Sequence, residues 1–337
     1  MKIGVVGTGI FATDAHVPAF EQAGNIQVTA AYNRTKSKAE KFVEVASNGQ
    51  AKVYDSIDEV FSDANIDAVD GLLPVDNNLE LVKKAIAAGK PLAFEKPIAH
   101  DLDAAKKIVE LTNKSDVPIM VLENWCFHER TLKMKELVKK IGKVELFLYQ
   151  TTKPFFISKY HQTAWRQKPK HIGGFISDGG VHDMAFITEV LGDVAEVNAR
   201  TSQLREQNGD IDTLNAQLRL ESGAFGSFTY AKAFGAADST LSFQIFGTEG
   251  SVVFDGNSIV LRTGPDGNDM SSETFELAPE SVNGVVSEFK NFTEAVKTND
   301  KSVIVSTPAK SFHHFATIVA CTESSKKNGN TVQVSKA

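Results

Sequence analysis

Short apolar segments alternate with amphipathic segments along the first 122 residues. The apolar segments cover residues 2–7, 26–32, 68–74, 91–97 and 117–124. Between them, apolar residues recur at helical spacing, as in Lys36–Glu44, Leu79–Ala88 and Asp101–Thr112. Alternation of strand and helix favours right-handed βαβ units, and therefore a parallel sheet with helices on both faces. The pattern predicts a doubly wound α/β domain over residues 1–122.

The hydrophobic pattern changes after about residue 122, and we expect a second domain over residues 123–337. A helix near Glu129–Lys140 and a strand at 143–152 come first. From about Val194 most segments have the residue pattern of strands: Val197–Gln203, Thr213–Leu220, Ala224–Ala231, Leu241–Phe246, Ser251–Phe254 and Ser258–Arg262. Turn signals at 221–223 and 247–250 separate them, so an open, mostly antiparallel sheet is predicted. Two helices, about Val282–Lys297 and Thr307–Lys326, follow, and the part from about 300 to 337 is a candidate for packing back on the first domain.

Composition narrows the class of protein. The chain has 337 residues, of which 42% are hydrophobic and 23% charged, as in a folded globular protein of about two domains. A formal net charge of −6 argues against nucleic acid or an anionic membrane as the main partner. No segment approaches the ~20 apolar residues of a membrane helix. Met1 leads almost directly into the first strand and two cysteines give no disulfide framework, so we expect a cytoplasmic protein.

A glycine-rich turn follows the first strand. Gly7, Gly9 and Ala12 have the G-x-G-x-x-A spacing, with a strand before them and a helical segment after. The first glycine permits a tight turn, the second lets the backbone approach a pyrophosphate, and a small third residue allows close helix–strand packing. The helix start offers unpaired N–H groups to the anion. We expect a dinucleotide against Gly7, Thr8, Gly9, Ile10 and Phe11; the alternative is a glycine-rich turn of another α/β fold.

The residues after the second strand bear on the choice between NAD and NADP. An NAD site usually has an Asp or Glu here, which accepts a hydrogen bond from the ribose 2′-hydroxyl. The sequence of residues 32–38 is YNRTKSK, without an acid. A guanidinium can bind a 2′-phosphate through two hydrogen bonds. The pattern predicts NADP(H), with Arg34 as the main contact and Asn33 and Lys36 beside it; the alternative is a solvated basic helix start.

Lys96 follows another strand of the predicted parallel sheet, in the segment Glu95-Lys96-Pro97. Ligands of such sheets bind beyond the carboxyl ends of the strands. An ammonium group at this edge can polarise a substrate oxygen and stabilise a developing alkoxide. A surface lysine is the alternative.

The segment Gly173–Met184 reads GGFISDGGVHDM. Asp178 and His182 are four residues apart, so they share one face if the segment is a helix. Gly179 and Gly180 each cost that helix about 1 kcal/mol relative to Ala. We interpret them as room for a cofactor or substrate, where a Cβ would collide. The alternative makes Asp178 an N-cap and His182 a packed core residue.

Together these motifs resemble those of the glucose–fructose oxidoreductase / inositol dehydrogenase / MocA family. They are Gly7-x-Gly9-x-x-Ala12, Glu95-Lys96-Pro97, and Gly173-Gly174 with Asp178-x-Gly180-x-His182, in family order and at family spacing. The resemblance covers essentially the whole chain. Residues 163–183 look especially like a fungal, NADP-dependent cytosolic branch.

The resemblance implies an N-terminal Rossmann domain and a C-terminal α/β domain whose open sheet face forms a homodimer. Lys96 would hydrogen-bond the reacting oxygen, in a Lys–Pro peptide that is often cis. His182 would be the general acid/base, with Asp178 positioning the substrate or His182. The residues implied as further contacts to cofactor or substrate are Leu73, Pro74, Asn78, Glu95, Asn124, Trp165 and Arg166, with Tyr160 and His161 as weaker candidates.

The sequence departs from the family pattern at two positions. Many members have an acid three residues after the motif histidine, where this chain has Ala185 next to Asp183. Many have a histidine four residues after the proline of the nicotinamide loop, where Asn78 follows Pro74. Both departures put the substrate class in doubt more than the reaction class.

The leading functional hypothesis is an NADP(H)-dependent oxidoreductase that interconverts an alcohol and a carbonyl on a sugar, polyol or small aldehyde. The alternative is a non-catalytic, NADP-binding sensor of the same family, which would need neither Lys96 nor His182. A third hypothesis keeps the cofactor bound and uses transient oxidation for elimination or hydrolysis.

Overall fold

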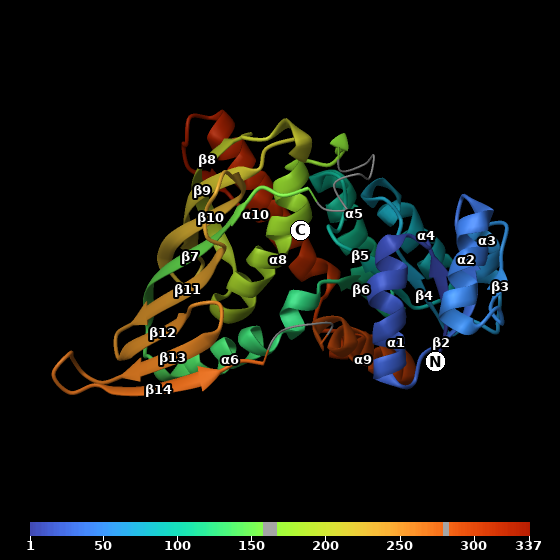
Figure 1. Cartoon of the computed structure of the whole chain (residues 1–337), viewed down its shortest axis with the longest axis horizontal. Coiled ribbons are helices and arrows are strands. Elements are labelled where there is room, and N and C mark those ends of the chain that lie inside the picture. The colour runs from blue at the N-terminus through green and yellow to red at the C-terminus, as the bar shows by residue number, and fades with distance from the viewer. Residues whose placement is uncertain (158–166, 279–282) are drawn as a thin grey trace. The chain divides into compact units, whose positions relative to one another are not determined.

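The computed structural model describes residues 1–157, 167–278 and 283–337. The chain divides into two compact units (Figure 1). Unit 1 comprises Met1–Phe127, Ser281–Phe312 and Ala337, and unit 2 comprises His128–Glu280 and His313–Lys336. Trp165 and Arg166, and also Tyr160 and His161, lie outside the described residues.

Unit 1 is built on a six-stranded parallel sheet in the order β3-β2-β1-β4-β5-β6. The strands are β1 (Lys2–Val6), β2 (Gln27–Tyr32), β3 (Lys52–Val53), β4 (Ala68–Gly71), β5 (Leu92–Glu95) and β6 (Ile119–Leu122). The helices are α1 (Val17–Ala23), α2 (Lys36–Ser47), α3 (Ile57–Ser62), α4 (Asn78–Ala88) and α5 (Leu102–Asn113), with a π-helical turn at Ala12–His16. This strand order is that of a dinucleotide-binding doubly wound sheet, and it confirms the predicted parallel α/β fold.

Local sequence signals account for several of these boundaries. Asp101 caps α5 by accepting from the N–H of Ala104, and Ser56 and Glu59 form a reciprocal capping box at α3. Gly89, in the left-handed region, ends α4. These three helices therefore begin or end where a residue satisfies backbone groups that the helix itself leaves open.

The hydrophobic core of unit 1 includes a helix from the later part of the chain. Phe289 and Phe292 of α9 (Asn283–Thr298) are fully buried in it. The Phe289 and Phe20 rings meet edge to face, with centroids 4.7 Å apart. Figure 1 shows α9 in orange beside α1 in blue. The segment that completes unit 1 is therefore 281–312, whereas 313–336 belong to unit 2.

Unit 2 is built on a nine-stranded, mostly antiparallel sheet in the order β14-β13-β12-β11-β7-β10-β9-β8-β15. The strands are β7 (Val144–Pro154), β8 (Val194–Ser202), β9 (Thr213–Leu220), β10 (Phe225–Phe234), β11 (Thr240–Gly247), β12 (Gly250–Phe254), β13 (Ser258–Thr263), β14 (Ser271–Glu276) and β15 (Val332–Gln333). The predicted open, mostly antiparallel sheet is confirmed, with β7 and β10 as its parallel pair. The sequence did not predict β14, because it is polar and almost wholly exposed and pairs only with β13.

Helices α6 (Glu129–Leu137) and α8 (Gly174–Leu191) lie against one face of this sheet (Figure 1). An aromatic cluster fills the space between α8 and the sheet: Tyr149, Phe186, Phe228, Phe243 and Phe254. The ring of Phe186 from α8 meets Phe243 edge to face at 5.2 Å. This packing sets the distance between α8 and the sheet.

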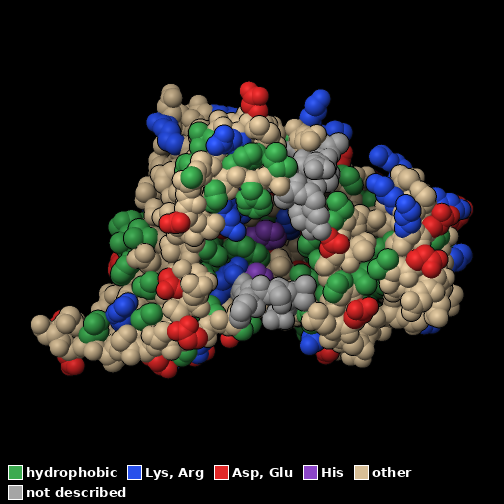
Figure 2. Space-filling model, in the orientation of Figure 1, with side chains coloured by type: hydrophobic (Ala, Val, Ile, Leu, Met, Phe, Trp, Pro, Cys, Tyr) green, Lys and Arg blue, Asp and Glu red, His purple; other side chains and the backbone are tan. Residues whose placement is uncertain are grey.

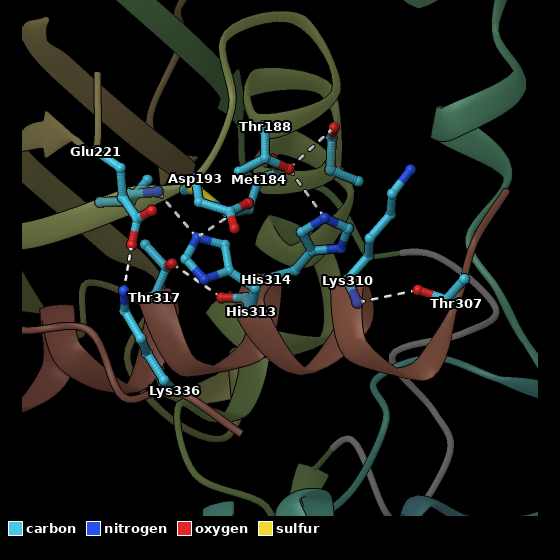
Figure 3. A network of polar contacts seen from close by, with 12 residues as sticks. Met184, Thr188, Asp193, Glu221, Thr307, Lys310, His313, His314, Thr317 and Lys336 are labelled. Carbon is cyan, nitrogen blue, oxygen red and sulfur yellow. Dashed lines mark hydrogen bonds and ion pairs between the residues drawn. The ribbon is translucent and has the colours of Figure 1, made fainter. Parts of the chain in front are cut away.

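The end of α8 is held by helix α10 (Pro308–Lys326) through two adjacent histidines (Figure 3). His314 Nε2 lies 2.9 Å from Thr188 Oγ1, and the Val194 N–H donates to His313 Nε2 at 2.9 Å. Burial lowers the pKa of His313, in keeping with its role as an acceptor. Both histidines therefore have structural partners.

In the described part of the chain, no helix is long and apolar enough to cross a membrane.

Candidate active site

The glycine loop lies at the carboxyl end of β1, and its first glycine is required by the backbone. Gly7 has φ +103°, and a Cβ there would stand 2.3 Å from the carbonyl oxygen of Leu72. The N–H of Gly7 donates to the carbonyl of Tyr32 at 2.8 Å. The loop is thus held between the ends of β2 and β4, where only glycine has room.

The rest of the loop has features that suit a dinucleotide. A Cβ on Gly9 would meet nothing within 4 Å, so the backbone there is open to a ligand. Thr8 Oγ1 is buried and has no hydrogen-bond partner among the described residues. Ile10 and Phe11 expose 42% and 38% of their surface beside it. Ala12 is fully buried where the helical segment starts, as a small third residue should be.

The sequence-predicted residues of unit 1 share one edge of its sheet. Each group follows the carboxyl end of a parallel strand, and those ends lie on the same side because all six strands run in the same direction. The groups are Gly7–Phe11 after β1, Asn33 and Arg34 after β2, Leu73 and Pro74 after β4, Glu95 and Lys96 at β5, and Asn124 after β6. The fold therefore brings these candidates to one edge of unit 1.

Arg34 is exposed at the start of α2, and its neighbours are already engaged. Lys36 Nζ lies 2.7 Å from Asp55 Oδ1 in an exposed ion pair, and the Asn33 side chain accepts from the N–H of Thr35 at 3.0 Å. Basic and acidic side chains lie next to one another over α2 and α3 on the right of Figure 2. Arg34 is in no hydrogen bond or ion pair with another described residue, so its guanidinium is available to a ligand.

Lys96 is presented by a loop that a buried asparagine holds. The Asn78 side-chain amide donates to the carbonyl oxygens of Glu95 and Pro97 at 3.1 Å and of Ile98 at 3.3 Å. Asn78 is fully buried at the start of α4, and the Lys96–Pro97 peptide is cis. Asn78 thus acts on the backbone of the lysine loop.

A buried charged cluster lies behind that loop, and the sequence did not reveal it. His16 ends the π-helical turn; its Nδ1 lies 2.7 Å from Asp70 Oδ2 and its Nε2 lies 3.2 Å from Glu95 Oε1. Burial disfavours the imidazolium, but Asp70 and then Glu95 outweigh it and raise the pKa of His16 to about 10. No local pattern marks a histidine that acts through partners 54 and 79 residues away.

Glu288 of α9 extends the same cluster. Its carboxyl is buried, with an Oε1 that has no hydrogen-bond partner among the described residues. Burial, followed by the charge of Glu95, raises the pKa of Glu288 well above its usual range. The surroundings of Glu288 therefore favour its protonated, neutral form.

In unit 2, Asp178 and His182 lie on α8, as the spacing predicted, and both are partly exposed. The next residue on the helix, Asp183, is fully buried and accepts from the Tyr149 hydroxyl at 2.6 Å. The helix therefore has one acid anchored against the sheet and an acid and a histidine at its accessible side.

The interpretation of the two glycines as room for a ligand is wrong for Gly179. A Cβ there would stand 2.1 Å from the hydroxyl oxygen of Tyr230 on β10, so a side chain of the same unit occupies that space. A Cβ on Gly180 would make only ordinary contacts, the nearest 3.4 Å away on Ile176. Gly179 lets α8 approach the sheet.

Among the residues that the structure describes, no group of three or more His, Cys, Asp or Glu side chains could hold a metal ion. The two cysteines, Cys126 and Cys321, are buried and free.

Known proteins resemble the chain over nearly its whole length. Residues 1–123 match the family model "Oxidoreductase family, NAD-binding Rossmann fold", and residues 135–334 match "Oxidoreductase family, C-terminal alpha/beta domain". Uncharacterized protein YMR315W of Saccharomyces cerevisiae is 41% identical, over 99% of this chain and 98% of that protein. Myo-inositol 2-dehydrogenase of Thermotoga maritima is 26% identical, over 90% of each.

A solved oxidoreductase from Thermotoga maritima, TM0312, superimposes with a TM-score of 0.86 at 32% identity, covering 99% of this chain and 98% of that one. The chain belongs to the glucose–fructose oxidoreductase / inositol dehydrogenase / MocA family of oxidoreductases, with an NAD-binding Rossmann domain and the family's C-terminal α/β domain.

Proposed function

We propose that the protein is an NADP(H)-dependent oxidoreductase that interconverts an alcohol and a carbonyl on a sugar, polyol or small aldehyde. The observation that carries the proposal is the placement of Lys96 on the same sheet edge as the glycine loop. Strand β5 is separated from β1 only by β4, and the buried Asn78 amide holds the lysine loop in place. The name of the Thermotoga relative, a myo-inositol 2-dehydrogenase, supports a polyol or sugar as the substrate class.

The proposed roles follow from the chemistry of the side chains. The bound nicotinamide supplies or accepts the hydride. The Lys96 ammonium donates a hydrogen bond to the reacting oxygen and stabilises the negative charge that develops on it. His182 takes the hydroxyl proton during oxidation and returns it during reduction, and Asp178, one helical turn earlier, orients the imidazole or the substrate. Each role needs one residue that the family resemblance assigns and that this chain retains.

The test is a panel of carbonyl compounds and polyols scored by NADPH absorbance, with wild type, Lys96→Met, His182→Asn and Asp178→Asn. We expect kcat/KM to fall by at least about 100-fold for the lysine and histidine variants, in line with loss of one electrostatic or proton-transfer contribution. NADPH binding, followed by its fluorescence, should persist. Full rates in both variants would refute the catalytic roles. NADPH binding with no turnover of any compound would favour the sensor, and product without net cofactor change would favour the third hypothesis.

The preference for NADP(H) rests on Arg34. The guanidinium is exposed at the start of the 12-residue helix α2, whose free N–H groups also favour an anion. Lys36 is engaged by Asp55, whereas Arg34 precedes the helix and its planar guanidinium can bind a 2′-phosphate through two hydrogen bonds. Arg34→Ala should raise KM for NADPH by about 10-fold or more and leave KM for NADH nearly unchanged, whereas Lys38→Ala should change neither. An unaltered NADPH/NADH ratio in Arg34→Ala would refute the assignment.

A homodimer through the open face of the unit 2 sheet belongs to the same proposal. Leu148 of β7 and Phe225 of β10 expose 39% and 56% of their surface on the face away from α8. Light scattering of wild type against Leu148→Glu tests it, with dimer expected for the first and monomer for the second. A wild-type monomer at micromolar concentration would refute it.

A further inference from the structure

Two lysines stand side by side on the face of the unit 2 sheet that α8 covers. Strands β7 and β10 pair in parallel, with Thr151 opposite Tyr230. Lys153 lies two residues after Thr151 and therefore on the same face of β7. The register of the pair shifts after Ala231, so the position of Lys232 is given by its contacts, which lie on the α8 side of the sheet. The sequence gives no sign of this pair, because its strands are separated by about 75 residues of chain and their register is set only in the folded sheet.

The pair lies beside the turn of α8 that carries the candidate catalytic residues. Lys232 Nζ is 4.6 Å from the centre of the Tyr230 ring and 3.6 Å from the point where a Cβ would stand on Gly179. Gly179 is the neighbour of Asp178 in the helix. An ammonium group therefore lies next to the helical turn that carries Asp178.

The protein around the pair balances its positive charge only in part, through the single carboxyl of Asp183 that attracts both ammonium groups. Neither ammonium makes a hydrogen bond or ion pair within the described residues. Asp183 also accepts from the Tyr149 hydroxyl. Burial, followed by the charge of Lys232, lowers the pKa of Lys153, and Arg130 adds to the same repulsion.

Like charges on neighbouring strands destabilise a sheet, and half-buried ammonium groups lose hydration in addition. Such an arrangement is expected where a ligand supplies the missing negative charge. A carboxylate or phosphate can accept hydrogen bonds from both ammonium groups at once, which a neutral hydroxyl cannot do with comparable strength.

We propose that Lys153 and Lys232 form an anion-binding subsite, so that the substrate is a hydroxy or carbonyl compound that also carries a carboxylate or a phosphate. The proposal rests on the proposed function, which it narrows from sugars and polyols in general to acidic ones. The two lysines bind and orient the substrate, and the chemical step stays with Lys96 and His182.

The experiment compares three probes with one carbon skeleton: D-glucose, D-glucuronate and D-glucose 6-phosphate, each with NADPH. The enzymes are wild type, Lys153→Met, Lys232→Met and the double variant. Lys143→Met is the matched control, because Lys143 is exposed and precedes the first residue of β7, at the opposite end of that strand from Lys153. We expect wild type to prefer one anionic probe to glucose, and each single variant to raise its KM by about 10-fold or more with little change for glucose. Lys153→Arg and Lys232→Arg should restore part of the loss. The KM for the anionic probe should also rise with ionic strength.

Binding of non-reacting anions separates this proposal from the proposed function. D-gluconate, which has no aldehyde or ketone to be reduced, and inorganic phosphate are titrated by calorimetry into the NADPH-loaded protein and its variants. Anion binding that is lost in the double variant supports the subsite, even if no probe is reduced and the proposed function fails. Equal constants in wild type and double variant, absence of binding by every anionic probe, or turnover of glucose at least as efficient as that of both anionic probes, would overturn the subsite and leave the oxidoreductase intact.

Discussion

His16 and Asp70 form a fully buried pair, with His16 Nδ1 2.7 Å from Asp70 Oδ2. Asp70 lies within β4, and His16 ends the helical turn that follows the glycine loop. The other imidazole nitrogen faces Glu95, which precedes Lys96. One protonated ring therefore connects the loop that would hold the pyrophosphate with the strand end that presents the lysine.

This pair should make stability depend on pH. The folded state keeps the His16 proton up to about pH 10, whereas an unfolded histidine releases it near 6.5. The contribution is thus complete below about pH 6.5 and is lost as the pH rises toward 10. We expect His16→Gln to lower Tm by several degrees at pH 6.5, and the difference from wild type to shrink by pH 10. His100→Gln, which alters a partly exposed histidine, serves as control; a constant difference across this range would contradict a charged His16.

Replacing Glu288 with Gln should stabilise the protein at neutral pH. The folded pKa of Glu288 is raised by burial, so folding requires the carboxyl to stay protonated where the unfolded chain ionises it. The contribution of Glu288 to stability is therefore complete below the pKa that it has in the unfolded chain, and it is lost as the pH rises through the higher pKa that it has in the folded protein. The Tm gain of Glu288→Gln should grow between pH 5 and 8, by about 2–4 °C for each kcal/mol. Glu294→Gln, exposed on the same helix, should show no such growth, and a Tm loss for Glu288→Gln at pH 8 would show the carboxylate to be ionised.

Gly179 and Gly180 should differ sharply in their tolerance of a methyl group. Gly179→Ala places a Cβ against the buried Tyr230 hydroxyl and should cost about 1–3 kcal/mol. Gly180→Ala meets only ordinary contacts and should be neutral or stabilising by up to about 1 kcal/mol. The double variant Gly179→Ala/Tyr230→Phe should recover much of the loss, which a double-mutant cycle of thermal unfolding measures. Equal effects of the two alanines would mean that Tyr230 yields easily.

Asn78→Asp should disturb the loop that presents Lys96 more than Asn77→Asp does. The new carboxylate would face the carbonyls of Glu95, Pro97 and Ile98 in place of a donating amide, and a buried unpaired charge is costly. We expect kcat to fall by about 10-fold or more through misplacement of Lys96, with a lower Tm. Asn77→Asp, exposed on the adjacent turn, should keep both values. Wild-type kcat in Asn78→Asp would show that the loop keeps its shape without the amide.

The predictable part of the molecule is the part encoded locally. The parallel fold, the glycine turn and the helix with Asp178 and His182 follow from spacing within about ten residues, and the structure has these elements. The role of Gly179 was misjudged because its constraint, Tyr230, is 51 positions away in the sequence. The His16 cluster and the pair of Lys153 and Lys232 depend on strand order and register, which no local pattern specifies.

The core of the nucleotide-binding unit has a late contributor. Phe289 and Phe292 of α9 fill it, yet more than 150 residues of unit 2 are synthesised between β6 and α9. On the ribosome, the first 127 residues emerge without α9, so the apolar side chains that pack against Phe289 and Phe292 lack these partners until α9 is synthesised. During synthesis, unit 1 can therefore complete its core only after α9 has been made. A fragment that stops at Phe127 would leave the apolar side chains that normally contact α9 accessible to chaperones.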